Sequence, residues 1–345
     1  MKEHTKTIHK YTGAIHIHSV CSDGTGDVRK ISAEAKKAGL DWVIITDHNN
    51  FDAEEGIFNG VTVIKGEEIS PDDSDHYLAL GINKQLDFND NPQINVNSVK
   101  ENGGFGFAAH PDESDRRKNK YEPINWTDKN VIPDGIEIWN WFSAWGDNFD
   151  TSNIFTIAYA YLFKNKLVKK PNRKTLDWWD KINKDSENIV PAIGGIDAHA
   201  LKVKYIIPLT IFPYQSMFKT ILNETALKEP LADDFETRKK QILNALKNGN
   251  NIIFNKYISQ QPPEFFISNG EENAYAGESL YLNEKTEVKL NCDKISDITI
   301  YKDNVKMISL KERNCTVRIT EKGKYRFEAE INGFGYAYSN PVTVR

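Results

Sequence analysis

The chain has 345 residues, of which 39% are hydrophobic and 27% charged, and a formal net charge of −5 at pH 7. It is longer than one average domain and can bury a sizeable core. Non-specific nucleic-acid binding requires a basic surface, and this chain is weakly acidic. Nucleic acid is therefore expected only as a nucleotide or short oligonucleotide. The chain lacks an apolar run of about 18 residues that could cross a membrane and an apolar leader after its first residues. Three cysteines are too few for a disulfide framework, and we expect a cytoplasmic globular protein with no membrane partner.

Seven short apolar runs, mostly β-branched and bounded by Gly, Pro or Asn, predict buried strands in the first two-thirds of the chain. They are residues 13–19, 42–49, 61–70, 76–81, 103–111, 134–140 and 190–199. Helices are predicted at 27–38, where Asp27 caps the helix and Gly39 ends it, and at 152–166, 173–184 and 235–248. Alternating strands and helices predict an α/β fold with a mostly parallel sheet or a small, irregular (β/α) barrel.

The pattern changes near residue 258, where we place a domain boundary. Beyond it, polar and apolar residues alternate, which predicts strands at 286–291, 296–303, 315–320, 324–331 and 338–345. Turn residues separate these strands at the spacing of a β-sandwich. The predicted domains are therefore residues 1–257, the α/β part, and residues 258–345, a small antiparallel β domain for packing or oligomerisation.

Six of the 8 histidines lie in or beside predicted strands, and acids accompany them. The candidate metal ligands are His16, His18, Asp23, His48, Glu68, His76, His110, Asp197 and His199. His16 and His18 should share one side of a strand because side chains alternate with period two, and Asp197 and His199 should do the same. Strand ends are where a (β/α) barrel builds its active site. Imidazoles and carboxylates without thiolates are typical ligands of hydrolytic zinc, manganese or iron centres.

Two other acids are neighbours of these candidates along the chain. Asp47 precedes His48 and either orients a metal ligand from behind or caps the following turn. Glu67 precedes Glu68, and the alternation of a strand predicts that it points away from the metals.

The motifs HIHSVCSDGTG, ITDHN, GEEIS, HYLALG, AAHP and GGIDAHA, in this order, resemble the motif series of the polymerase and histidinol phosphatase (PHP) superfamily. The resemblance covers about residues 11–255 and implies a distorted (β/α)7 TIM-like barrel that hydrolyses phosphate esters with two or three divalent ions, zinc, manganese or iron. It implies one site of His16, His18, Glu68 and Asp197, a second of Asp23, His48 and His199, and a third of Glu68, His76 and His110. Asp23, Glu68, Asp197 and His199 are expected to be catalytic. The segments IEIWN, LDWWDK and AYSNPVTV are similar to the branch that includes carbaryl hydrolase.

We therefore expect a metal-dependent phosphoesterase that hydrolyses a small phosphorylated substrate with a metal-activated hydroxide. Arg116 and Arg117 follow His110 and are candidates for a bidentate phosphate clamp, with a charged surface loop as an equal alternative. Hydrolysis of a carbon ester or carbamate is the alternative reaction, which an apolar aromatic pocket would favour. Trp139 and Trp141 fit either the wall of such a pocket or the core. A binding module with structural metals is disfavoured, since a structural zinc ion needs only four ligands.

Overall fold

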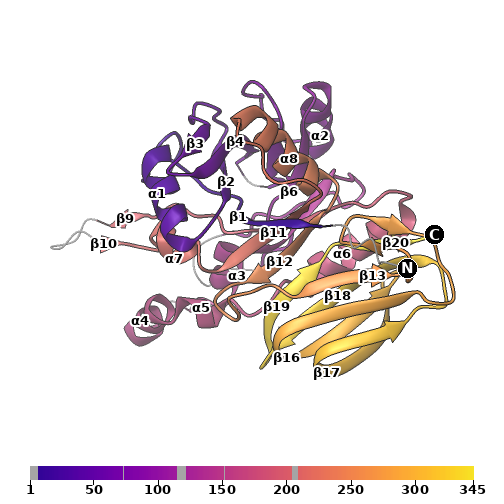
Figure 1. Ribbon diagram of the computed structural model, residues 1–345. Coiled ribbons are helices and arrows are strands. Elements are labelled where there is room, and N and C mark those ends of the chain that lie inside the picture. Colours follow the sequence, from indigo (N-terminus) through magenta and orange to yellow (C-terminus); the bar gives the residue numbers. More distant parts are fainter. Residues whose placement is uncertain (1–6, 73, 115–121, 151, 204–208) are drawn as a thin grey trace.

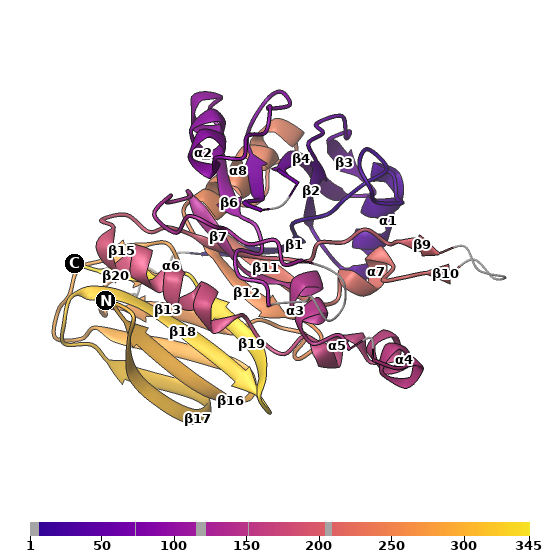
Figure 2. The ribbon, with the colours of Figure 1, turned by 180° about the vertical axis from the view of Figure 1, so that it is seen from behind.

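The computed structural model describes residues 7–72, 74–114, 122–150, 152–203 and 209–345. Helices and strands of the first two-thirds form one side of the molecule, and a twisted sheet of C-terminal strands forms the other (Figures 1 and 2). Eighteen of the strands belong to one continuous hydrogen-bonded sheet. This arrangement confirms the mixed α/β class. Within the described ranges, none of the helices combines the length and the apolar character that crossing a bilayer requires.

Seven strands of the first two-thirds pair one after another in a series. They are β1 (His9–Ala14), β2 (Trp42–His48), β4 (Val61–Ile69), β5 (Tyr77–Leu80), β6 (Phe105–Ala108), β7 (Gly135–Asn140) and β8 (Ala192–Gly195). The pairs β1–β2, β2–β4, β6–β7 and β7–β8 are parallel, whereas β4–β5 and β5–β6 are antiparallel. The series returns to its start beyond β8, because the amides of Ile196 and Ala198 donate to the carbonyls of Ile15 and His16. The strand ends therefore converge.

The first predicted strand is wrong in its position. β1 ends at Ala14, and His16 has a φ of +66°, which a regular strand does not allow. The period-two argument for His16 and His18 therefore fails, although both side chains still turn inward. His110 and Asp197 also have positive φ values, 29° and 53°. Strained backbone of this kind gathers at functional sites, where the surrounding structure enforces it.

Helix α1 (Val28–Ala38) confirms both predicted ends. The Asp27 side chain accepts a hydrogen bond from the backbone amide of Lys30, and Gly39 closes the helix in the left-handed conformation at φ 76°. A side-chain oxygen of Asp at the N-cap accepts a hydrogen bond from a first-turn backbone amide that has no partner within the helix.

Two of the other three predicted helices match single helices of the structure. The remaining helices are α2 (Pro92–Glu101), α3 (Trp141–Asp147), α4 (Ile154–Leu162), α5 (Lys164–Leu167), α6 (Arg173–Asp185), α7 (Tyr214–Met217) and α8 (Phe235–Lys247). Helices α6 and α8 match the predictions at 173–184 and 235–248. The predicted helix at 152–166 is broken at Phe163 into α4 and α5. Helices α2, α3 and α7 were not predicted.

The C-terminal part is made of strands, as predicted, but several boundaries differ. Its strands are β13 (Glu264–Ser268), β14 (Asn273–Ala274), β15 (Ser279–Leu280), β16 (Glu287–Lys302), β17 (Val305–Arg318), β18 (Gly323–Ile331), β19 (Phe334–Ser339) and β20 (Val342–Val344). Two predicted strands merge into β16, whose pairing with β17 shifts register between Asn291 and Ser296. The last predicted strand divides into β19 and β20.

Four strands of the preceding region were not expected as separate elements. They are β9 (Lys202–Val203), β10 (Leu209–Thr210), β11 (Ile221–Leu227) and β12 (Asn251–Asn255), and β3 (Gly56–Phe58) forms a further short pair with β4. Strand β11 pairs with β1 and β12, and β12 pairs with β19. The two predicted domains thus share one sheet, and the boundary at residues 257 and 258 stays a prediction.

A buried ion pair fastens α6 to β18. The Arg326 side chain is 3% exposed, and its guanidinium donates to both oxygens of Asp180 at 2.6 and 2.5 Å and to Glu328 at 2.9 Å. The guanidinium carbon also lies 4.2 Å from the ring centroid of Tyr301. Because two carboxylates and an aromatic face surround Arg326, its charge is compensated inside the protein.

We predict that Asp180→Asn lowers the free energy of unfolding by about 3 kcal/mol, because removing one partner leaves a buried charge without compensation. Urea unfolding followed by circular dichroism measures the change. Asp177→Asn is the matched control: its side chain is 66% exposed and pairs with Arg173, so its loss should cost less than about 1 kcal/mol. Equal effects of the two substitutions would contradict the anchoring role of Asp180.

Candidate metal centre

All nine predicted ligands lie together at the ends of the seven strands or in the loops that follow them. Their nitrogen and carboxylate oxygen atoms form overlapping groups, within each of which the atoms lie no more than 4.8 Å apart. The groups are His18–Asp23–His48–His199, His16–His110–Asp197, His16–His18–Glu68 and His48–Glu68–His76. Six segments that are distant in the sequence contribute to them. The groups overlap more than the three expected sites, since His16, His18, His48 and Glu68 each belong to two of them.

Glu68 is the carboxylate at the middle of the cluster. Its side chain is fully buried at the end of β4. Its two oxygens lie 2.9–3.4 Å from ring nitrogens of His16, His18, His48, His76 and His110. Burial by itself raises the pKa of Glu68, but the imidazoles around it hold this pKa well below its usual value. Glu68 is therefore an ionised carboxylate surrounded by five imidazoles.

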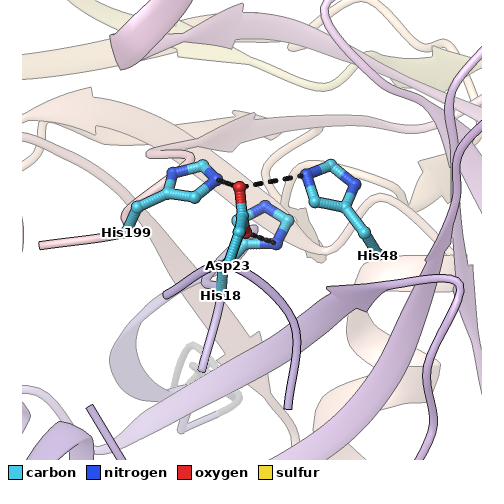
Figure 3. A group of neighbouring side chains, drawn as sticks. All are labelled: His18, Asp23, His48 and His199. Atoms are coloured by element: carbon cyan, nitrogen blue, oxygen red, sulfur yellow. Dashed lines mark ion pairs between the residues drawn. The ribbon is translucent and has the colours of Figure 1, made fainter. Parts of the chain in front are cut away.

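The group around Asp23 is the solvent-facing side of the cluster. Figure 3 shows His18, His48 and His199 directed toward the Asp23 carboxylate. Asp23 Oδ2 lies 3.2 Å from His199 Nε2 and 3.9 Å from His48 Nε2, and Oδ1 lies 3.7 Å from His18 Nδ1. Burial raises the pKa of Asp23, but His199 and the other imidazoles lower it to about 2. The Asp23 side chain is 55% exposed, so a substrate can approach the cluster from this side.

Four buried atoms of the cluster lack hydrogen-bond partners. Eight buried side-chain nitrogen or oxygen atoms of the described residues have none, and four of these are His16 Nε2, His18 Nδ1, His18 Nε2 and Glu68 Oε2. Leaving a buried polar atom without a partner costs about 1–3 kcal/mol. A divalent cation would satisfy these atoms, because imidazole nitrogens and carboxylate oxygens are ligands that zinc, manganese and iron accept. The residues present therefore fit metal ions.

Glu137 on β7 supports the cluster and was not predicted. Its Oε1 lies 2.9 Å from His16 Nδ1, and its Oε2 accepts hydrogen bonds from the backbone amide of His110 and from Asn140. Although burial lowers the pKa of His16, the carboxylates around it, Glu137 included, raise that pKa well above its usual value. A Cβ at Gly195 would collide with Glu137 Oε1, which explains the glycine there. The sequence signal was a lone acid in the apolar run IEIWN.

Asp47 holds the loop that carries Asp23. It accepts hydrogen bonds at 2.6 Å from the backbone amide and hydroxyl of Ser19 and from the hydroxyl of Ser22. It thus fixes the loop between His18 and Asp23, which agrees with the expectation that Asp47 positions a candidate ligand from behind.

Glu67 lies apart from the cluster, as the alternation predicted. It is fully buried, and its Oε2 accepts a hydrogen bond from the backbone amide of Leu86 at 2.9 Å. Glu67 belongs to none of the four groups of candidate ligands.

A cavity of about 270 Å³ adjoins His110. Most of its lining is polar and includes Asp112, Asn140, Ser143, Lys170, Asn172 and Thr175. Trp139 borders this cavity but is only 1% exposed, and Trp141 is fully buried, so both belong mainly to the core. An aromatic ring that does contact the cluster is that of Phe142, whose centroid lies 6.0 Å from that of His199. Arg116 and Arg117 lie outside the described residues.

Comparison with known proteins gives distant likenesses. No protein-family model matches the chain. An uncharacterised protein of Methanocaldococcus jannaschii is 31% identical over 115 residues, which cover 28% of this chain and 66% of that protein. The chain therefore spans less than two thirds of that relative.

Solved structures offer three further likenesses. One is a two-domain protein from Bacteroides vulgatus described as containing a predicted PHP-like metal-dependent phosphoesterase, with a TM-score of 0.44, 15% identity and 99% of both chains covered. PsfC from Pseudomonas syringae gives 0.41 at 12% identity, covering 70% of this chain and 97% of its own. An amidohydrolase from Chromobacterium violaceum gives 0.32 at 13% identity, covering 59% and 92%. Likenesses with such low TM-scores do not indicate a function for this chain.

We predict that Glu137→Gln weakens binding of Mn²⁺ or Zn²⁺ about 10- to 100-fold, because a ligand imidazole loses the carboxylate that orients it. Competition with a chelating dye on metal-depleted protein measures the affinity. Glu55→Gln is the control, since Glu55 pairs with Lys239 at 2.7 Å and belongs to none of the four groups. Unchanged affinity in Glu137→Gln would contradict the orienting role.

Proposed function

We propose that the chain is a PHP-type metal-dependent phosphoesterase that acts on a small phosphorylated substrate. The observation that carries this proposal is the convergence of nine imidazole and carboxylate side chains on one shared buried carboxylate, Glu68. A structural zinc site needs only four ligands, so a set of nine supports catalysis by several ions. In this proposal the series of seven paired strands corresponds to the distorted barrel that the sequence motifs imply.

The chain's own residues divide into holding and substrate-facing roles. Glu68, with both oxygens among imidazoles, would help to hold more than one ion, and buried Asp197, 3.6 and 3.3 Å from His16 and His18, would balance positive charge there. Divalent ions bound there supply Lewis acidity and a hydroxide nucleophile near neutral pH. Asp23 and His199 lie at the solvent-facing side, where they border the reacting phosphate.

The surroundings of the cluster favour a polar substrate. The cavity beside His110 is lined by hydroxyl, amide and carboxylate side chains and by Lys170, whose ammonium group pairs with Glu330 at 3.0 Å. Such a lining can hydrogen-bond a phosphorylated, hydroxyl-bearing molecule. An apolar cavity, which a carbamate with a large aromatic leaving group would need, is not found beside His110 in the described part of the chain.

Hydrolysis of a carbon ester or carbamate is the second candidate, and one contact favours it. Phe142 lies against His199, and Trp145 stacks beside Phe142 with centroids 6.0 Å apart. An aromatic leaving group could pack on these rings. The same metal ions would serve both reactions, so only substrate tests separate them.

We predict that protein purified without chelator carries two or three divalent ions per chain, as elemental analysis measures. It should hydrolyse 4-nitrophenyl phosphate or bis(4-nitrophenyl) phosphate, and a chelator should abolish this activity, because the ions generate the nucleophile. Turnover of 1-naphthyl N-methylcarbamate alone would favour the second candidate. Less than one ion per chain, not restored by added Mn²⁺, Fe²⁺ or Zn²⁺, would contradict both.

We predict that Glu68→Ala loses activity together with more than one equivalent of metal, because Glu68 is the carboxylate that the groups share. His9→Ala is the control, since His9 lies at the start of β1 and belongs to none of the four groups. Metal content and activity of this control should match the wild type. Wild-type metal content in Glu68→Ala would contradict the bridging role.

A further inference from the structure

A buried phenol contacts the backbone that carries the solvent-facing side of the cluster. Tyr214 opens α7 and is 1% exposed. Its hydroxyl donates to the carbonyl of His18 at 2.7 Å and lies 3.2 Å from the carbonyl oxygen of His199. It also accepts hydrogen bonds from the backbone amides of Thr25 and Gly26, at 3.2 and 3.1 Å. Because a phenol has one proton to donate and two lone pairs, every hydrogen-bonding position of this hydroxyl is occupied.

These contacts join both ends of the loop that carries Asp23 to the segment that carries His199. The loop begins after the carbonyl that accepts from Tyr214 and ends at the two amides that donate to it. At this second end, the amide of Thr25 also donates to the His199 carbonyl at 3.0 Å. The phenol therefore lies where three stretches of backbone meet, and these stretches carry three of the four side chains drawn in Figure 3.

The loop packs too closely on this junction to allow a side chain at either of its glycines. A Cβ at Gly24 would lie 2.1 Å from the carbonyl oxygen of His18, and a Cβ at Gly26 would lie 2.6 Å from Cε2 of Tyr214. The loop thus rests directly on the backbone and on the phenol ring. A change in the position of Tyr214 would therefore change the position of the loop and of the carboxylate that the loop carries.

The four residues drawn in Figure 3 are held in two different ways. His48 ends β2, whose parallel pairing with β4 sets it opposite Glu68. His18, Asp23 and His199 instead lie beyond the ends of β1 and β8, where an isolated bridge replaces the regular ladder. The relative positions of these three residues therefore depend more on side chains that bind the backbone, as the phenol does.

We propose that Tyr214 is a positioning residue for the ion that His18, Asp23, His48 and His199 would hold, an assignment that rests on the proposed metal-dependent function. Its hydroxyl sets the affinity for this ion. Ligands have to stay within about 0.5 Å of their places for a site to keep its geometry. Without the hydroxyl, a backbone amide of the loop loses its acceptor, and the loop is free to move away from the His199 segment.

Two of the other groups of candidate ligands should keep their affinity. They are His16–His110–Asp197 and His48–Glu68–His76, and neither contains a residue whose backbone the phenol contacts. A general weakening of the fold would lower the affinity of all the groups alike. The difference between the ions therefore separates a positioning role from a contribution to stability alone.

Tyr214→Phe tests the proposal, because it removes only the hydroxyl. Titration of metal-depleted protein with Mn²⁺ in competition with a chelating dye measures the successive affinities. One binding step should weaken about 10-fold or more, as when a metal ligand loses its support, and the other steps should keep their wild-type affinity. Tyr336→Phe is the matched control: this fully buried hydroxyl donates to the Gln261 carbonyl at 2.6 Å, and its loss should leave every step unchanged. Far-UV circular dichroism checks that each variant folds.

Two further variants identify the ion concerned. Asp23→Ala removes a ligand of the same ion, so Tyr214→Phe should cause no further loss of affinity on that background, since residues that act on one ion are not additive. Gly26→Ala would displace the phenol ring while keeping its hydroxyl, should weaken the same step, and provides the test should Tyr214→Phe not fold.

Three results would overturn the positioning role while leaving the proposed function intact. They are a wild type that binds several ions together with unchanged affinities in Tyr214→Phe, an equal weakening of every step in that variant, and a further loss on the Asp23→Ala background. A wild type that binds no Mn²⁺ would contradict the proposed function and the role of Tyr214 with it. None of these measurements depends on turnover of a substrate.

Discussion

The site depends on a buried carboxylate that is surrounded by imidazoles. Glu68 is fully buried at the end of β4, and ring nitrogens from five histidines lie within 3.4 Å of its oxygens. An isolated carboxylate in such a position would take up a proton to avoid the cost of burying its charge. Only positive charge held around it keeps it ionised, and several of the surrounding lone pairs have no protein partner. Metal ions meet both requirements at once.

The backbone around this cluster is shaped by residues that touch no metal in our proposal. Glu137 contacts the His16 ring and accepts a hydrogen bond from the backbone amide of His110. Asp47 accepts a hydrogen bond from the amide of Ser19 and so fixes the loop between His18 and Asp23. Glu137 thus contacts two of the residues that adopt positive φ values, His16 and His110. The strain is retained because hydrogen bonds and close packing, such as that at Gly195, over-determine the local geometry.

The two parts of the chain are joined more closely than the change in sequence pattern near residue 258 indicated. The strands β11 and β12 carry the hydrogen bonding from β1 to β19, and the buried pair of Arg326 and Asp180 fastens α6 to β18. On the other side of the molecule, aromatic contacts run from His199 through Phe142 to Phe212, which also meets Tyr161 of α4. The cluster and helix α4 are thus parts of one packed body.

The sequence by itself determined the strand-rich α/β pattern, the helix from Asp27 to Gly39, and the identity of the nine clustered side chains, because residue types and caps act locally. It did not determine why His16 and His18 converge, since a left-handed residue and a bridge to residues 196–198 replace the expected regular strand. Nor did it find Glu137, β11 or the pairing of β12 with β19. These features arise from partners more than a hundred residues away or from strand order, and only tertiary packing brings such partners together.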